Sequence, residues 1–208
     1  MEPPTITPVA SDHTVDPVLG DVPAADPGPL AASWLPPREG EPMRMTLSTI
    51  DADGFPRART VLLSEFDGER FFFHTDARSH KVADLAADPR VALTILWPDS
   101  SRQLVVQGTA APAPAEECAE VYRRRSPYLQ QLAWLNTAEY AQLPLSEREA
   151  RWARFGADAV PPPQPADWVG FGVRPHRYLF WAAHPDAASR RVEYVRSADG
   201  WTRRPLPG

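Results

Sequence analysis

The architecture of this chain follows from residues 71–81, Phe71-Phe72-Phe73-His74-Thr75-Asp76-Ala77-Arg78-Ser79-His80-Lys81. The aromatic run predicts a strand over 70–75, and the Ser-x-Lys after the turn predicts a helix over 79–87. At a helix N-terminus, the unpaired backbone N–H groups and the helix dipole both favour an anion. Because two hydroxyls and a Lys accompany this helix start, the stretch predicts a site that holds a phosphate.

The sequence on both sides of this stretch alternates with a period of two, as half-buried strands do. Upstream, strands are predicted over 43–50 and 56–64, joined by the turn Asp51-Ala52-Asp53-Gly54. Downstream, strands are predicted over 91–97 and 102–111, and the unbroken apolar run of 91–97 predicts burial on both faces. Further strands are predicted over 168–173, 177–182, 191–195 and 201–204.

Helical patterns interrupt the strands. Short helices are predicted over 29–35, 115–125, 127–135 and 147–155, and Ser146 is predicted to cap the last one, with Glu149 in the capping-box position. Antiparallel strands with a few helices indicate an α+β protein, mainly β, built on a small barrel rather than on a doubly wound sheet. No Gly-x-Gly-x-x-Gly is present, which argues against a Rossmann nucleotide site.

The domain organisation follows from composition. Residues 1–28 are rich in Pro and poor in large apolar groups, so they are predicted to be disordered in isolation. Residues 29–208 are predicted to form one domain, with a helical insert over about 115–156 and C-terminal strands over about 167–205.

Charge, hydropathy and cysteine content limit the partners. The net charge of −5 gives no basis for binding nucleic acid. No apolar run approaches the roughly 20 residues of a membrane helix, and the N-terminus lacks a signal-peptide pattern. Cys118 is the only cysteine, which fits a reducing compartment. We therefore predict a cytoplasmic protein that binds neither nucleic acid nor membrane.

The order of the motifs resembles that of the pyridoxamine 5'-phosphate oxidase family, from about residue 26 to the C-terminus. The resemblance implies an antiparallel Greek-key split β-barrel that forms a homodimer, with FMN at the dimer interface. It depends on the ordered set and not on one piece. The pieces are Arg59-Thr60-Val61-Leu62-Leu63, the stretch 71–81, Asp88-Pro89-Arg90-Val91-Ala92-Leu93, Arg102-Gln103 and Phe180-Trp181.

The resemblance implies which residues hold the FMN phosphate. Arg59 and Lys81 would neutralise it, helped by Thr75 and Ser79, with Arg as a fixed fork of donors and Lys as a mobile charge. His80 stands where the family commonly has Arg, so one positive charge becomes dependent on pH.

Other residues would contact the flavin ring. The backbone of Val61 and Leu62 would run along it, Gln103 would hydrogen-bond its edge, and Trp181 and Arg191 would reach it, with Arg191 as a positive charge that tunes the cofactor. The predicted cofactor-binding set is Arg59, Thr60, Val61, Leu62, His74, Thr75, Ser79, His80, Lys81, Gln103, Trp181 and Arg191.

Each of these residues also has a structural explanation. Arg59, Lys81 and Arg191 fit solvated surface charges, and Gln103 fits a polar strand position. Trp181 and His74 fit core packing.

The substrate positions depart from the family pattern. Tyr122 matches a family Tyr that touches substrate phosphate, and Arg125 lies next to a position where the family has Arg. Ser64, Tyr122 and Arg125 are the predicted substrate contacts; no catalytic base and no metal ligand is assigned. The positions where the family has Lys, Arg, Arg and His are occupied by Ser64, Ser126, Ala187 and Ser189.

Three functions therefore remain open. Each lost phosphate contact costs about 1–3 kcal/mol, so the pocket would bind pyridoxine phosphate weakly. The first function is therefore an FMN-dependent oxidoreductase that transfers hydride from a small amine, alcohol or ring compound without phosphate, with O₂ as acceptor. The second is a true pyridoxamine/pyridoxine 5'-phosphate oxidase that reaches the phosphate with other arginines. The third is a binding protein without turnover that takes a flavin, a deazaflavin or haem.

Overall fold

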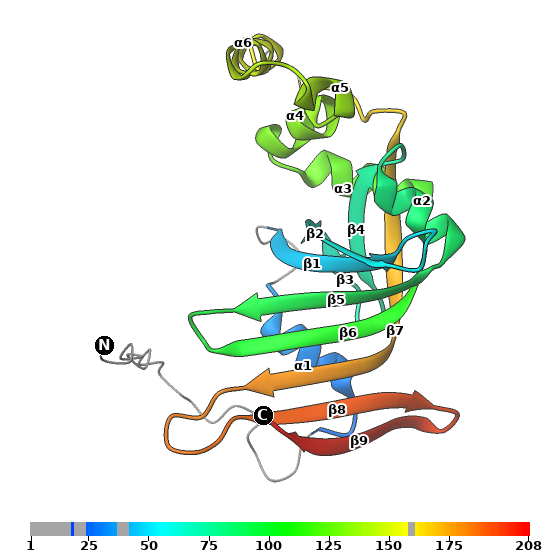
Figure 1. The fold of residues 1–208 in the computed structure, drawn as a ribbon, viewed down its shortest axis with the longest axis vertical. Helices are drawn as coiled ribbons and strands as arrows, with labels where there is room; N and C mark the ends of the chain where they lie inside the picture. The colour runs from blue at the N-terminus through cyan, green and yellow to red at the C-terminus, as the bar shows by residue number, and fades with distance from the viewer. Residues whose placement is uncertain (1–17, 19–23, 37–41, 158–160) are drawn as a thin grey trace.

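The computed structural model of the protein describes residues 18, 24–36, 42–157 and 161–208 (Figure 1). The predicted disorder of residues 1–28 therefore lies largely outside the described residues. The strands of the described chain are β1 (Met43–Ile50), β2 (Pro56–Leu63), β3 (Glu65–Phe66), β4 (Phe71–Asp76), β5 (Arg90–Trp97), β6 (Arg102–Pro112), β7 (Trp168–Ala182), β8 (Arg190–Ser197) and β9 (Gly200–Pro207).

All pairings between these strands are antiparallel. The main path of the sheet has the order β2-β1-β5-β6-β7-β4-β3, and β8 and β9 continue from β7. The sheet curls into a half-barrel (Figure 1). Its concave side is filled by apolar side chains that are fully buried, among them Phe71, Phe73, Leu104 and Phe180. The predicted α+β class with an antiparallel barrel is confirmed.

One long strand, β7, replaces two predicted ones. Along one edge, β7 pairs with β6; along the other, residues 168–173 pair with β4 and residues 177–182 pair with β8. The register shifts between Gln107 and Gly108 of β6, opposite Pro175. A proline cannot donate to the ladder, and a bulge accommodates it without ending the strand. The prediction of separate strands over 168–173 and 177–182 was therefore wrong.

The predicted two-sided burial of 91–97 was also wrong. Val91, Leu93 and Ile95 of β5 are buried, whereas Leu96 is 54% exposed. Side chains of a strand alternate between two faces, and only one face of β5 meets the filled side of the half-barrel.

One helix lies against the middle of the sheet, and the others lie toward one end of the molecule (Figure 1). α1 (Pro27–Trp34) is capped by Asp26, whose carboxylate accepts from the Gly28 N–H, and Trp34 packs against Trp97 and Phe180 with ring centroids 5.6 and 5.2 Å away. α2 (His80–Ala87) follows β4 directly. α3 (Ala115–Arg124), α4 (Pro127–Leu135), α5 (Ala138–Ala141) and α6 (Leu145–Phe155) gather at the opposite end of the molecule from β8 and β9 (Figure 1).

The capping box predicted for the last helix does not form. α6 begins at Leu145 with Pro144 as its N-cap, and no side chain caps it. With Pro144 as the N-cap, the helix starts two residues earlier than it would with Ser146 in that position. None of the described helices is long and apolar enough to cross a membrane.

The start of the described chain is tied to its end. Val18 is fully buried, and the Tyr194 hydroxyl on β8 donates to the Ala24 carbonyl at 2.9 Å. Residues close to the N-terminus thus contribute to the same core as the last strands.

Candidate functional site

A pocket of about 250 Å³ lies where β2, β4 and the start of α2 meet the end of α3 and α4. It brings together eight residues of the predicted cofactor set and one predicted substrate contact. They are Arg59, Thr60, Val61, Leu62, His74, Thr75, Ser79 and Lys81, with Arg125 as the substrate contact.

The start of α2 forms the polar floor of this pocket. The Lys81 ammonium donates to the Thr75 hydroxyl at 2.9 Å, and the hydroxyls of Thr75 and Ser79 lie 3.4 Å apart. Ser79 is the N-cap of α2, but its side chain makes no cap hydrogen bond. The hydroxyls of Thr75 and Ser79 and the Lys81 ammonium thus meet at the N-terminus of α2, an arrangement suited to an anion.

Arg59 lines the pocket from β2, and residues of β1 and α2 hold its guanidinium. Its guanidinium donates to the Thr49 hydroxyl at 2.7 Å and to the carboxylate of Asp84 at 3.2 Å. Asp84 is buried on α2 and also accepts from Thr49 at 2.7 Å. The ion pair fixes the side chain of Arg59 and neutralises part of its charge.

Two cations share one end of the pocket. Burial lowers the pKa of Lys81, and the neighbouring positive charge of Arg59 lowers it further. An anion between them would relieve both effects, because it would favour the charged form of Lys81.

Arg125 supplies a third cation at the other wall. Its guanidinium lies over the Trp168 ring at 4.4 Å from the centroid, and its Nε is buried with no hydrogen-bond partner among the described residues. Burial lowers its pKa to about 10, so it is charged at neutral pH. Within the described chain no carboxylate pairs with Arg125, which leaves its charge free for a ligand.

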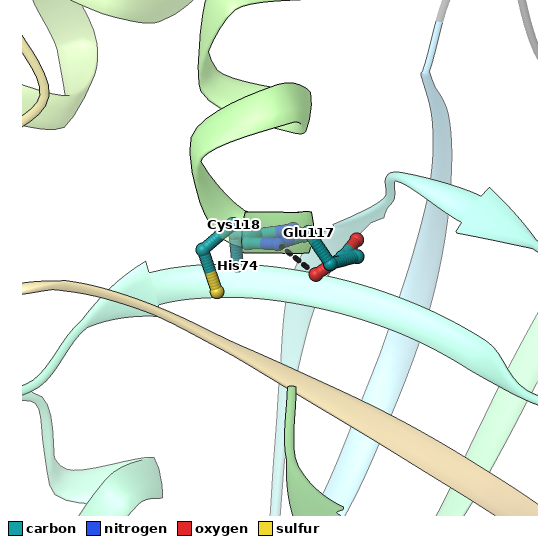
Figure 2. A group of neighbouring side chains, drawn as sticks. All are labelled: His74, Glu117 and Cys118. Carbon is teal, nitrogen blue, oxygen red and sulfur yellow. Dashed lines mark hydrogen bonds and ion pairs between the residues drawn. The ribbon is translucent and has the colours of Figure 1, made fainter. Parts of the chain in front are cut away.

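The wall beside Arg125 contains a hydrogen-bonded cluster centred on His74 (Figure 2). His74 on β4 has a side chain with no exposed area; its Nε2 lies 3.2 Å from the Glu117 carboxylate and its Nδ1 lies 2.9 Å from the Ser64 hydroxyl. Because a carboxylate only accepts, Nε2 is the donor in the contact with Glu117, and the direction of the hydrogen bond between Nδ1 and Ser64 depends on the tautomer of the ring. The ring also stacks on Trp168 at 5.3 Å.

Cys118 completes this cluster from α3. Its thiol and the donor atoms of His74 and Glu117 all lie within 4.8 Å of one another. Burial raises the pKa of the thiol, and the Glu117 carboxylate raises it further. Gly170 on β7 makes the approach possible, since a Cβ there would lie 2.6 Å from His74 Nε2 and 2.9 Å from Cys118 Sγ.

The other predicted substrate contacts are engaged within the protein. The Tyr122 hydroxyl donates to the Pro162 carbonyl at 3.1 Å, and burial raises its pKa, so it stays protonated. The Ser64 hydroxyl is hydrogen-bonded to His74 Nδ1 at 2.9 Å. Ser126, at a position where the family has Arg, caps α4 by accepting from the Leu129 N–H at 3.4 Å.

The remaining cofactor residues form a second group away from the pocket. Gln103 on β6 pairs with Trp181 on β7, which in turn pairs with Arg191 on β8. Directly paired residues present their side chains on the same face of a sheet, so these three make one row across the strands. The Nε of Arg191 is buried without a hydrogen-bond partner in the described part of the chain. His80 is exposed and does not line the pocket.

The pocket fits an FMN phosphate better than it fits a neutral ligand. It joins a helix N-terminus to Lys81 and Arg59, and the strand backbone at 60–62 borders the same space. Several residues of this site were missed from the sequence. Asp84, Glu117, Cys118 and Trp168 have no local motif, and the only signal was that Cys118, Val121 and Tyr122 share one helix stripe.

Comparisons with known proteins agree with this geometry. The family described as "Pyridoxamine 5'-phosphate oxidase" matches residues 38–182. A pyridoxine/pyridoxamine 5'-phosphate oxidase of Caulobacter vibrioides is 34% identical over 206 residues, covering 94% of this chain and 89% of that protein. One of the same name from Anaeromyxobacter dehalogenans is 38% identical over 160 residues, covering 74% and 79%.

Solved structures share the fold. PhzG from Burkholderia lata 383, in complex with tetrahydrophenazine-1-carboxylic acid, superimposes with a TM-score of 0.80 at 25% identity and covers 95% of this chain and 99% of that one. A pyridoxamine 5'-phosphate oxidase-related, FMN binding protein from Nostoc punctiforme PCC 73102 has a TM-score of 0.67 at 15% identity, covering 79% and 88%. The predicted split barrel is confirmed.

Proposed function

The chain belongs to the pyridoxamine 5'-phosphate oxidase family, and from this premise we propose that it is an FMN-dependent oxidoreductase whose substrate is a small ring compound carrying a carboxylate in place of a phosphate. The observation that carries the proposal is Arg125, a buried cation in the pocket wall with no acidic partner among the described residues.

The cofactor part of the proposal rests on the floor of the pocket. Lys81, Arg59 and the start of α2 would hold the FMN phosphate, with Thr75 and Ser79 as hydroxyl donors. When bound, FMN supplies an acceptor for a hydride from a substrate carbon, and O₂ is the proposed final oxidant. The chain itself binds and orients the two reactants and excludes other geometries.

Two separate groups of cofactor residues favour a homodimer. Gln103, Trp181 and Arg191 form a row that does not line the pocket of Arg59 and Lys81. A complete site would combine the pocket of one protomer with the row of its partner, which is the arrangement the family resemblance implies. FMN would then lie at the interface.

The substrate part of the proposal follows from which donors are free. A phosphate dianion needs several charge-assisted donors. Here Tyr122 donates its hydroxyl hydrogen to the Pro162 carbonyl, Ser64 is hydrogen-bonded to His74, and Ser126 accepts from the Leu129 N–H. Among these positions only Arg125 offers a positive charge, and one guanidinium matches one carboxylate in bidentate geometry. The PhzG structure, with its bound carboxylic acid, supports this choice.

The test is a screen of ring compounds on the FMN-loaded protein under anaerobic conditions, with bleaching of the flavin absorbance as the signal. We expect carboxylated ring compounds to bleach the flavin and their amides to fail. The proposal is wrong if no carboxylate dependence is found among compounds that reduce the flavin.

The Arg125→Met variant provides the matching prediction. Loss of one charge-assisted contact of about 1.5–3 kcal/mol should weaken the carboxylated substrate by about 10- to 100-fold, measured as KM or as Kd of a product analogue. FMN affinity should not change, because Arg125 is assigned to the substrate. Arg123→Met is the matched control, since Arg123 is an exposed neighbour on α3.

A second candidate is a true pyridoxine/pyridoxamine 5'-phosphate oxidase. The relatives of that name at 34% and 38% identity favour it. Adding pyridoxine phosphate under air and measuring pyridoxal phosphate separates the two candidates, since only the second predicts rapid formation of that product.

A further inference from the structure

We propose that His74, Glu117 and Cys118 form a binding site for one Zn²⁺ ion that ties α3 to β4. This site borders the proposed flavin pocket, which His74 also lines, but the metal-binding proposal does not depend on the proposed function. The three side chains come from two elements, His74 from the sheet and the other two from the start of α3 (Figure 2).

The spacing of the donor atoms suits a tetrahedral ion. Ligand atoms at about 2.0–2.3 Å from Zn²⁺ lie about 3.3–3.8 Å from one another. His74 Nε2 and the Glu117 carboxylate are 3.2 Å apart, and the three donor atoms lie within 4.8 Å of one another. A small closing movement of the Cys118 side chain would complete three ligands, with water in the fourth position.

The donor types also select the ion. Imidazole, thiolate and carboxylate together are ligands that Zn²⁺ accepts, whereas Ca²⁺ and Mg²⁺ prefer oxygen alone. One carboxylate oxygen, Glu117 Oε1, is buried and has no hydrogen-bond partner among the described residues. A buried acceptor left without a partner is costly, and a cation bound by both oxygens of Glu117 would satisfy it.

The surroundings are prepared for a ligating histidine. The Nδ1 of a metal-bound His commonly hydrogen-bonds a second group that fixes the ring, and Ser64 lies 2.9 Å from Nδ1 of His74. Trp168 stacks on the same ring. Gly170 leaves the space between His74 Nε2 and Cys118 Sγ free of a side chain.

The test uses Co²⁺ as a spectroscopic substitute for Zn²⁺ on the full chain without an affinity tag, after chelator dialysis. Difference spectra cancel any flavin that copurifies. Because Cys118 is the only cysteine, a thiolate-to-cobalt charge-transfer band can arise only from this residue. We expect that band at one Co²⁺ per chain, its displacement by Zn²⁺, and its loss in Cys118→Ser.

Matched variants separate this site from surface binding. Glu117→Gln and His74→Ala should lower the affinity for Co²⁺ by more than about 10-fold. Ser64→Ala should lower it by about 10- to 100-fold. Glu116→Gln and His176→Ala, which change exposed residues of the same types, should not. One equivalent of Zn²⁺ should also raise the melting temperature of the wild-type chain, but not of Cys118→Ser. Absence of the charge-transfer band in the wild-type chain, or equal Zn²⁺ stabilisation of Cys118→Ser, would overturn the proposal.

Discussion

At the scale of single residues, the three cations of the pocket differ in what already surrounds them. Arg59 is paired with Asp84, Lys81 touches only hydroxyls, and Arg125 touches an aromatic face. A bound anion would therefore gain most from Lys81 and Arg125, because neither makes an ion pair with a carboxylate among the described residues.

Lys81→Met should raise the Kd of FMN by about 10- to 100-fold, because a charge-assisted contact of about 1.5–3 kcal/mol is removed. Quenching of flavin fluorescence on binding measures the Kd. Riboflavin, which has no phosphate, is the control ligand, and its affinity should be almost the same in the variant and the wild type. Equal losses for both ligands would show that Lys81 acts on the fold and not on the phosphate.

Site residues that lie close together in the sequence could be predicted, and those that only the fold brings together could not. Thr75, Ser79 and Lys81 lie within one strand–turn–helix segment, so their sequence spacing determined their meeting. His74 and Glu117 are 43 positions apart, and no pattern in one sequence reports that pairing. Gln103, Trp181 and Arg191 were assigned by resemblance, and their role in binding FMN stays a prediction.

At the scale of elements, the continuity of β7 depends on one close approach. Gly108 lies at the shift of register in β6, where an added Cβ would lie 2.5 Å from the Arg174 carbonyl oxygen and 2.8 Å from a methyl of Val173. The Arg174 carbonyl belongs to the backbone of β7, which cannot move aside as a flexible side chain could.

Gly108→Ala should lower the free energy of unfolding by about 1–3 kcal/mol through this overlap, measured by urea denaturation. Gly54→Asn is the control, because Gly54 has a φ of +85° with open space around it, and Asn tolerates that backbone conformation. The prediction fails if Gly108→Ala is as stable as the control.

A second feature at this scale is the pair of ion pairs that Glu193 on β8 makes with the two neighbouring strands. The buried Glu193 carboxylate accepts from Arg177 on β7 and, at 2.5 Å, from Arg204 on β9. The hydrogen bond from Arg204 lowers the pKa of Glu193 below its ordinary value of 4.5, against the effect of burial, and Arg177 lowers it further.

A group whose pKa is lowered by folding stabilises the protein above its unfolded pKa and loses that effect as pH falls through the folded value. Glu193→Gln should therefore cost about 1–3 kcal/mol at pH 7 and less at pH 3, as seen in denaturant curves at both values. Glu147→Gln, in an exposed pair on α6, should cost at most about 0.5 kcal/mol. A penalty for Glu193→Gln that is the same at both pH values would contradict this account.

The elements themselves were largely predictable, and their boundaries less so. The helix over 127–135 and the first hairpin follow from local periodicity and turn residues. The start of α6 did not, because Pro144 and Ser146 are both residues at which a helix can start, and the local sequence does not decide between them. The single strand β7 was missed because Pro175 reads as a break unless its partner strand is known.

At the scale of the whole molecule, the two groups of cofactor residues make a prediction about assembly. We expect a variant of the pocket, Lys81→Met, and a variant of the row, Gln103→Ala/Arg191→Met, each to bind FMN poorly. A purified heterodimer of the two should bind about one FMN, since one of its sites combines the unaltered pocket and the unaltered row. No recovery in the heterodimer would place both groups in the same subunit's site.

The hydrogen bond between the Tyr194 hydroxyl and the Ala24 carbonyl has a consequence for biosynthesis. Trp34 leaves the ribosome early, yet its partner Phe180 and the Tyr194 hydroxyl are made near the end of translation. Contacts so distant in sequence close slowly. During synthesis α1 can therefore contact Trp97 before it can contact Phe180, and this part of the core is complete only when the C-terminal strands have been made.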